Sequence, residues 1–404
     1  MAAPLADITV IEVDNYMAAP STGAILADMG ARVVKVEPLT GDPMRGINRP
    51  AKVEGALKGY DFGFDVDNRG KRSIAVALDT EAGAAVMHRL VAGVQVFMCN
   101  LMPERQTRFG LDPASLMVVN PTLVHATLTG YGTSGPDAGR PGYDVTAFFG
   151  RSGLSDALVE GDGPPPHPRP AQGDHTAGLA LVAAILAALR LVDTTGQGQV
   201  TEVSLLHAAA WTMNSDLAAP LVDGIQPRLR DRHHLFSPLA NRYPCGDGRW
   251  VVLNMPEPRW WPVFCKAVDR PEWADDPRFA SVKQRFELMP ELVGMIDEAL
   301  SHRGRDEWAR IFDEHDLIWG PVQTFAELAA DPQAEAAGLW AEIDHPGTGP
   351  FRTVAVPLQV RGAAIGPRGP APRPGQHTRE VLAGLGYDES EIEALVEGGI
   401  ATGG

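Results

Sequence analysis

The strongest candidate for covalent chemistry in the sequence is Asp174, which lies between Gly173 and His175. An apolar segment follows, and its pattern predicts a helix over residues 175–192. An aspartate directly before a helix meets free N–H groups and the positive end of the helix dipole, which favours the carboxylate anion. A carboxylate among such small residues can approach a carbonyl carbon and attack it as a nucleophile. Aspartate is also a preferred N-cap residue, and most aspartates at such positions only cap.

Three histidines could take part in chemistry. His175 is placed to act as a general base beside Asp174, although a histidine near a helix start is more often a polar surface residue. His233 and His234 are adjacent, a pattern that invites a metal. Neighbouring side chains on a strand point apart, and no carboxylate partner is placed nearby, so we do not expect a metal site.

A glycine-rich stretch covers Gly130–Pro136 and continues at Gly142-Tyr143-Asp144. Glycines let backbone amides approach a ligand closely, but neither a Walker A nor a GxGxxG spacing is present, so an ordinary long loop fits as well. Residues 66–110 carry six Lys or Arg against four Asp or Glu. This local excess could meet the phosphates of a nucleotide-like ligand or form solvated surface. Its members include Arg69, Lys71, Arg72, Arg105 and Arg108.

The segments around these residues predict a doubly wound α/β fold. Strands are expected over 8–13, 31–37, 73–78, 94–98 and 123–129, with helices over 21–29, 81–92 and 113–119. Strand, helix and strand in succession form βαβ units, which imply a parallel sheet. Ligands of such sheets bind beyond the carboxyl ends of the strands. The chemistry is therefore expected in the loops 15–18, 37–49, 100–108 and 130–144.

The rest of the chain divides less sharply. Five prolines make residues 161–173 an irregular segment, and residues 201–206 form a strand or the start of a helix. We expect a large Rossmann-like domain from residues 1–220, a smaller α+β domain from 221–345, and a C-terminal segment, 346–404, that returns to the large domain. That segment should contain helices over 380–385 and 389–397.

Composition narrows the function classes. The chain has 404 residues, a net charge of −16 and a pI of about 5.1, so nucleic acid and anionic membranes are poor partners. The longest apolar run, residues 177–189, is too short for a membrane span, and we see no signal peptide. Three distant cysteines suggest neither disulfides nor a zinc–thiolate site. These observations predict a cytoplasmic protein.

Short sequence motifs are distributed over nearly the whole chain. They are Leu5–Val13, Ala18–Pro20, Leu26–Pro38, Gly41–Gly46, Asn68–Ser73, Gly130–Gly132, Gly135–Pro136, Pro141–Asp144, Gly173–Asp174, Thr195–Gln199, Asp276–Phe279, Gly320–Val322, Pro374–His377 and Gly384–Tyr387. In this order they resemble the class III coenzyme A-transferase family, which includes formyl-CoA, carnitine and benzylsuccinate CoA-transferases and a racemase branch.

The resemblance implies a homodimer of two subunits threaded through each other as interlocked rings. It implies that coenzyme A or acyl-CoA is a substrate, that a carboxylic acid accepts it, and that no cofactor is bound permanently. Asp174 matches the nucleophile of the transferases, and Tyr143 would lie beside the thioester with Asp144 next to it. Oxyanion donors are expected within residues 15–18. The residues matching the CoA site are Asn15, Met17, Ala18, Arg72, Asn100 and Arg108.

Two other functions are consistent with the same resemblance. An α-methylacyl-CoA racemase moves a proton with a histidine and an aspartate, but Tyr143 occupies the position of that histidine. Tyrosine, with a pKa near 10, is a poor base at neutral pH, which favours the transferase. A catalytically silent acyl-CoA-binding protein is disfavoured because Asp174 is retained. Residues 231–241 lack the glycine run that several transferases carry there, which leaves their role and the substrate range open.

Overall fold

The computed structural model describes residues 1–47, 61–226, 231–346 and 349–403, which form two compact units. The large unit comprises Met1–Asp156, His167–Gln226 and Glu335–Gly404. The small unit comprises Ala157–Pro166 and Pro227–Ala334. The C-terminal residues are thus part of the large unit, and the small unit is inserted between its segments.

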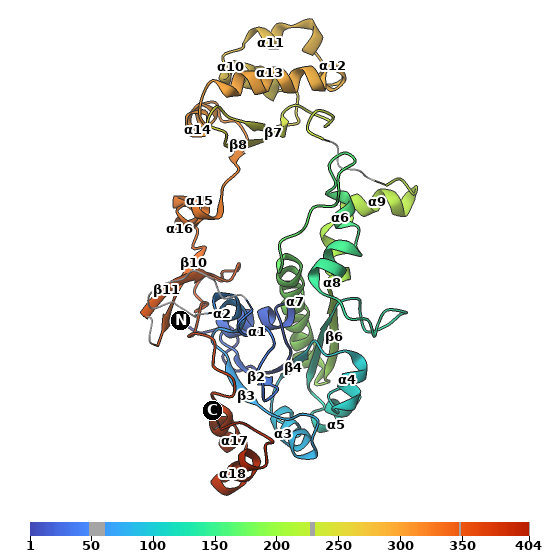
Figure 1. The fold of residues 1–404 in the computed structure, drawn as a ribbon, viewed down its shortest axis with the longest axis vertical. Coiled ribbons are helices and arrows are strands. Elements are labelled where there is room, and N and C mark those ends of the chain that lie inside the picture. Colours follow the sequence, from blue (N-terminus) through green and yellow to red (C-terminus); the bar gives the residue numbers. More distant parts are fainter. Residues whose placement is uncertain (48–60, 227–230, 347–348, 404) are drawn as a thin grey trace. The chain divides into compact units, whose positions relative to one another are not determined.

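The large unit is built on a six-stranded parallel sheet in the order β3-β2-β1-β4-β5-β6 (Figure 1). This is the order of a doubly wound sheet, whose direction of winding reverses between β1 and β4. The region expected to be strand or helix from residue 201 lies in a strand and then a helix. The strands are β1 (Thr9–Val13), β2 (Arg32–Glu37), β3 (Arg72–Ala75), β4 (Val96–Cys99), β5 (Val124–Thr129) and β6 (Gln199–Ser204).

Helices cover both faces of this sheet, which explains why the central strand β4 is an unbroken apolar run. Successive residues alternate between two cores: Val10 packs in the core beneath α1 and α7, and Ile11 packs in the core beneath α3 and α5. The helices of the large unit are α1 (Ala18–Asp28), α2 (Phe62–Asn68), α3 (Glu81–Val91), α4 (Pro103–Arg108), α5 (Pro113–Val119), the π-helix η2 (Asp144–Gly150), α6 (Leu154–Ala157, at the boundary), α7 (Gln172–Thr195), α8 (Leu205–Thr212), α9 (Asn214–Val222), α17 (Thr378–Gly384) and α18 (Glu389–Glu397).

Two departures from the predicted elements matter for the site. Helix α1 begins at Ala18 instead of residue 21, so its first turn reaches into the expected ligand loop. Residues 103–108 are helical where a loop was expected, because Pro103 at the first helical position has a backbone preset for a helix. The loop expected over 37–49 is described only to residue 47.

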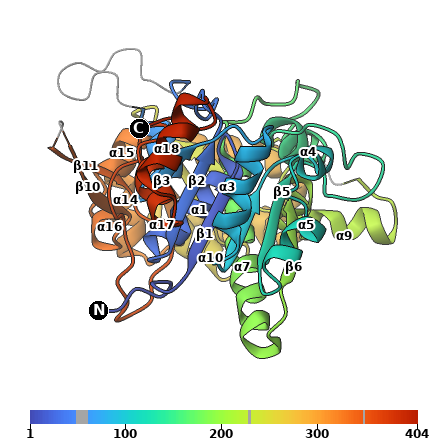
Figure 2. The same ribbon diagram turned by 90° about the horizontal axis from the view of Figure 1, so that it is seen from below.

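The C-terminal segment docks on the edge of the sheet. Ala77 N–H donates to Ile400 O, Thr402 N–H donates to Ala75 O, and Val76 forms a bridge with Ala401. Helices α17 and α18 therefore lie beside β3 (Figure 2). A separate hairpin, β10 (Trp340–His345) with β11 (Gly349–Val354), precedes them in the chain.

Helix α7 is, among the described residues, the one helix long and apolar enough to cross a membrane. Core helices of globular proteins meet the same test. One face of α7, at Ala177, Leu181, Val182 and Ile185, is buried in the core shared with α1 and the sheet. The spacing of these residues is that of one helical face.

The small unit has an apolar core of aromatic and branched side chains under a three-stranded antiparallel sheet. His233 and His234 lie at its surface, and the expectation that no carboxylate is placed near them is wrong, because both approach the carboxylate of Asp231, at 3.4 and 2.7 Å. The elements are β7 (Ala240–Pro244), β8 (Trp250–Asn254), β9 (Trp319–Pro321), α10 (Trp260–Ala267), α11 (Glu272–Asp275), η3 (Pro277–Phe279), α12 (Val282–Glu287), α13 (Met289–Ser301), α14 (Arg305–Glu314), α15 (Phe325–Ala329) and α16 (Pro332–Ala336, at the boundary).

Candidate active site

The centre of the site is the point where the sheet changes its direction of winding. Asn15 follows β1 and Asn100 follows β4, so the two residues emerge side by side. The Asn100 side-chain amide donates to Asn15 O at 2.7 Å, and Asn15 N–H donates to Asn100 Oδ1 at 3.2 Å. This reciprocal pair joins the two loops at the position where doubly wound sheets bind ligands.

A buried ion cluster supports the same loop from below. Lys35, on β2, donates to Asp14 O at 3.0 Å and to Asp14 Oδ1 at 2.7 Å, and its ammonium lies 3.1 Å from Asp42 Oδ2. The side chains of all three residues are fully buried. Asp42 Oδ1 in turn accepts the N–H of Tyr16 at 3.2 Å. The backbone of Tyr16 has a φ of 66°, a conformation that L side chains rarely adopt.

Asp174 approaches this loop from α7. It is the third residue of that helix, which begins at Gln172, so the prediction that Asp174 directly precedes the helix is wrong. The residue before the helix is Ala171, with a φ of 76°. Asp144, at the start of η2, accepts Ala171 N–H at 2.6 Å and so anchors the beginning of α7.

Two glycines allow α7 to sit close to its neighbours. A Cβ added to Gly173 would lie 2.5 Å from the ring of Phe148, and one added to Gly178 would lie 2.2 Å from Ser21 Oγ. Thr22 Oγ1, on α1, also donates to Gly178 O at 3.1 Å. The first turns of α1 and α7 are thereby held together, with Asp174 beside them.

The Asp174 carboxylate has no hydrogen-bond donor among the described residues of the chain. Burial raises its pKa to about 7, and the nearby Asp144 adds to this rise, whereas His175 opposes it. Burial and Asp144 therefore oppose the preference for the Asp174 anion that is expected at a helix start. His175 Nε2–H donates to Asp67 Oδ1 at 3.0 Å, and this contact raises the pKa of the histidine.

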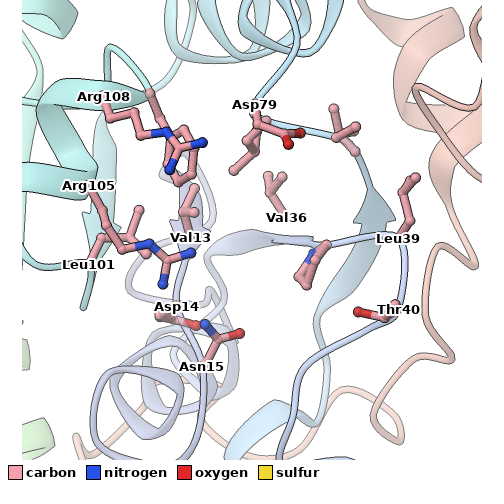
Figure 3. A pocket seen from close by; sticks show the side chains of 15 residues that line it. Val13, Asp14, Asn15, Val36, Leu39, Thr40, Asp79, Leu101, Arg105 and Arg108 are labelled. Carbon is pink, nitrogen blue, oxygen red and sulfur yellow. The ribbon is translucent and has the colours of Figure 1, made fainter.

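Two cavities meet at this edge of the sheet. The larger, of about 410 Å³, is bounded by α4 on one side and by the loops after β2 and β3 on the other (Figure 3). Arg105 and Arg108 reach over it from α4. The smaller, of about 180 Å³, has Asp174 in its wall. The cavities share three lining residues, Asn15, Leu101 and Arg105.

The structure brings together most of the residues singled out from the sequence. Arg108 lines the larger cavity. Met17 caps α1 and Asp144 anchors α7, and neither is among the residues that line the two cavities. Five of the expected residues line the smaller cavity: Asn15, Ala18, Asn100, Tyr143 and Asp174.

Arg72 lies elsewhere. It is the first residue of β3, whereas the residues that line the larger cavity follow the end of that strand. Its guanidinium pairs with Glu380 at 2.7 Å. Because ligands of parallel sheets bind at the carboxyl ends of the strands, this position does not favour a contact of Arg72 with CoA.

Two residues, Tyr16 and Arg105, stand out among the lining residues that were not selected from the sequence as binding residues. Tyr16 lines the smaller cavity, and its ring lies 5.3 Å from that of Tyr143 in an edge-to-face arrangement. Arg105 lines both cavities. The excess of basic residues over 66–110 pointed to Arg105, but the left-handed backbone of Tyr16 has no sequence signal, because that conformation is typical of glycine.

Only some of the N–H groups within residues 15–18 are free to stabilise an oxyanion. The N–H groups of Asn15 and Tyr16 are already donated to side-chain oxygens. Ala18 and Ala19 open α1, and first-turn N–H groups have no acceptor within their own helix. Ala18 lines the cavity that holds Asp174, so the start of α1 offers donors on that side.

The fold and the site define an α/β protein with a half-buried carboxylate and two arginines at the switch point of a doubly wound sheet. Comparison with known proteins identifies its family. The model of CoA-transferase family III matches residues 5–378. The (R)-2-hydroxy-4-methylpentanoate CoA-transferase of Clostridioides difficile is 32% identical over 96% of this chain and 97% of its own length. The succinate–glutarate CoA-transferase of Agrobacterium fabrum is 32% identical over 95% and 96%.

A solved structure gives the same result. A CAIB/BAIF family protein from Brucella suis matches with a TM-score of 0.85 and 29% identity, over 95% of this chain and all of that one. The chain belongs to CoA-transferase family III. It is a transferase that moves coenzyme A between a CoA thioester and a carboxylic acid, with these thioesters as substrates.

Proposed function

We propose that the transfer proceeds through covalent intermediates on Asp174. Its carboxylate oxygen attacks the carbonyl carbon of the donor thioester, the C–S bond breaks, and CoA leaves as a thiolate. The product is a mixed anhydride between Asp174 and the donor acyl group. The thiolate then attacks the Asp174 carbonyl carbon, which releases the donor carboxylate and leaves an aspartyl-CoA thioester. The acceptor carboxylate repeats these two steps in reverse order, so no metal or nucleotide is consumed.

One observation supports this role above the others: the Asp174 carboxylate lines a cavity and accepts no hydrogen bond from the described residues. Because this carboxylate accepts no hydrogen bond from these residues, no hydrogen bond has to break when it attacks. Its pKa of about 7 leaves a substantial fraction ionised at neutral pH and makes the anion more basic than an ordinary aspartate. The N–H groups that open α1 are positioned to receive the oxyanion that forms during attack.

The two connected cavities suggest how the CoA ester lies. Arg105 and Arg108 form no ion pair with a carboxylate in the described parts of the chain, so both guanidinium groups are available to phosphates in the larger cavity. Asn15 and Asn100 then flank the passage toward the smaller cavity. This places the thioester beside Asp174, with Tyr143 at the same wall.

The test of the covalent step is mass spectrometry after incubation with a panel of acyl-CoA donors, followed by trapping with hydroxylamine or borohydride. We expect a modification at Asp174 that is absent in Asp174→Asn. The matched control is Asp67→Asn, a second buried aspartate near α7, which should still be labelled at Asp174. If no donor labels Asp174 while CoA esters exchange their α-proton with D₂O, the racemase reading replaces this proposal.

The placement of CoA has its own test. Removing Arg105 and Arg108 together, as R105Q/R108Q, should lower kcat/KM for acyl-CoA by about tenfold or more, because charge-assisted contacts to phosphate are lost. The same variant should use an S-acyl-pantetheine, which lacks the nucleotide, as well as the unmodified enzyme does. An equal loss with both substrates would contradict the placement.

We also propose that the protein is a cytoplasmic enzyme that works as an interlocked homodimer. The large unit exposes apolar side chains on α8 and α9: Trp211, Leu221 and Val222 are 72%, 83% and 87% exposed. Exposed apolar groups of this size favour burial against a protein partner. Light scattering should give twice the chain mass, and a monomer at micromolar concentration would refute the dimer.

A further inference from the structure

Tyr16 is held in place at a backbone position where tyrosine is unfavourable. Its φ of 66° suits glycine and strains other residues. The conformation is fixed by Asp42 Oδ1, which accepts Tyr16 N–H, and Asp42 is fixed in turn by the buried Lys35. A glycine would take the same backbone conformation without strain.

Burial of the ring does not account for the tyrosine. Its side chain is 36% exposed, and the ring packs edge to face against Tyr143, which is itself 54% exposed. Both rings line the cavity that contains Asp174. The side chain of Tyr16 therefore contributes more to the surface of the cavity than to the core.

Part of the remaining wall of this cavity is apolar, although Asn15, Asn100 and Thr129 also line it. Leu128, Pro141 and Leu205 line it together with the two tyrosines. Among the described residues that line it, Arg105 is the one Lys or Arg, and it also lines the cavity assigned above to the nucleotide. The described residues that line this cavity thus offer aromatic and aliphatic surface beside Asp174, but no second cation for a second carboxylate.

We infer that Tyr16 is a specificity-determining residue, and that the wall of Tyr16 and Tyr143 receives the apolar side chain of a monocarboxylic acid. This inference rests on the proposed role of Asp174. The acids that fit carry an aryl or branched alkyl group, which can pack against the ring faces and edges. A dicarboxylic acid would lose the hydration of its second carboxylate against this wall without gaining a cation.

The substrate class is tested with matched acceptors and any acyl-CoA donor that supports turnover. In overall CoA transfer followed by chromatography, kcat/KM for 3-phenylpropanoate and 4-methylpentanoate should exceed that for glutarate by about tenfold or more. Preference for glutarate would overturn the inference. Failure of Asp174 labelling would instead remove the covalent mechanism, and the ranking of acids could still be read from the transfer reaction.

The role of Tyr16 is tested with a glycine and a phenylalanine variant. Tyr16→Gly relieves the backbone and removes the ring, so its thermal midpoint should not fall, while the preference for 3-phenylpropanoate over glutarate should drop by about tenfold. Tyr16→Phe keeps the ring and should retain the preference. A marked fall of the thermal midpoint in Tyr16→Gly would show that the ring stabilises the fold. An unchanged preference between the two acids would show that the ring has no role in selection.

A matched control lies in the small unit. Asp316 also has a left-handed backbone, with a φ of 52°, and its side chain is exposed. Asp316→Gly should likewise leave the midpoint unchanged or raise it, and it should leave the ratio of kcat/KM between the two acids as in the parent enzyme. A changed ratio in Asp316→Gly would show that relief of strain at any site alters selection, which would overturn the assignment to Tyr16.

Discussion

The core of the small unit and the ligand edge of the large unit treat buried polar groups differently. In the small unit, the buried Trp308 donates to Leu300 O at 2.8 Å and Tyr243 donates to Pro238 O at 2.7 Å. At the ligand edge, Asp174 has no donor among the described residues, and Glu12 Oε2 is buried without a hydrogen bond. Burial and the neighbouring Asp14 raise the pKa of Glu12 to about 7.

The small unit also holds a buried group without a hydrogen bond, Trp260 Nε1, but this group is neutral, and leaving it unpaired costs less free energy than leaving a buried acid unpaired. The difference indicates that packing stabilises the small unit, whereas the acids at the ligand edge lower the stability of the fold and serve the reaction. Each region should therefore respond to mutation in its own way. Loss of packing should dominate in the small unit, and removal of the Asp174 charge should stabilise the ligand edge while it abolishes transfer.

The largest expected effect lies in the small unit. Trp308 is 1% exposed and stacks on Phe312, so Trp308→Ala leaves a cavity and removes the hydrogen bond to Leu300. We expect a loss of about 3–5 kcal/mol in the free energy of unfolding, measured by urea denaturation. Ile318→Ala, at a 49% exposed position in the same unit, is the control and should cost less than about 1 kcal/mol. Equal costs would contradict the packing argument.

A pair of glycine substitutions sharpens the comparison. Both Gly178, in α7, and Gly294, in α13, lie within helices. A Cβ at Gly178 would lie 2.2 Å from Ser21 Oγ and 2.9 Å from Ala18 O, whereas one at Gly294 would meet nothing within 4 Å. Gly178→Ala should cost about 1–3 kcal/mol and lower kcat/KM, because α7 moves away from α1. Gly294→Ala should stabilise by about 0.5–1 kcal/mol. Stabilisation in both would show that the close approach at Gly178 is not required.

The positions of the main elements could be predicted from the sequence because the physical signals are local. Parallel strands buried on both faces read as β-branched runs, and α5 (Pro113–Val119) and α18 (Glu389–Glu397) were predicted over their observed residues. The sequence predicted the adjacency of Asn15 and Asn100 only in part. The loops were expected at one edge, but the strand order that makes β1 and β4 neighbours is set by tertiary packing.

The parts of the site that sequence patterns did not reveal depend on long-range contacts. Tyr16 adopts a glycine-like backbone because Asp42 and Lys35 hold it, and neither contact has a local signature. Burial and the nearby Asp144 raise the pKa of Asp174, and neither effect has a local sequence signature. Arg72, expected at the ligand, lies on β3, and whether a basic residue faces a cavity depends on strand register.

Asp174 also allows a direct measurement of the loss of folding stability at the ligand edge. Its pKa is about 7 in the folded protein and near 4 when unfolded, so the folded state binds more protons between these values. Its carboxylate therefore lowers stability progressively from pH 4 to pH 7, and the penalty is complete above pH 7. Asp174→Asn should raise the free energy of unfolding by about 1–2 kcal/mol at pH 8, after allowance for partial exposure, and change it little at pH 4.

The control for that measurement is Asp316→Asn in the small unit, where the side chain is exposed. It should change stability by less than about 0.5 kcal/mol at both pH values. If Asp174→Asn destabilises the protein at pH 8, the carboxylate has partners in solution that compensate for its burial. The contrast between the two regions would then be smaller than proposed.

The smallest effect concerns the pH dependence of transfer. Because the attacking group must be ionised, kcat/KM for the donor should rise with pH to a plateau above about 7, and fall about tenfold for each pH unit below it. Glu12 is the competing source of such a limb, since its pKa is also raised to about 7, but it does not line the cavity. Glu12→Gln should therefore keep the limb, and Asp174→Glu should move it. A limb that disappears in Glu12→Gln would assign the ionisation to the buried cluster, and Asp174 would then be ionised throughout the range in which the enzyme works.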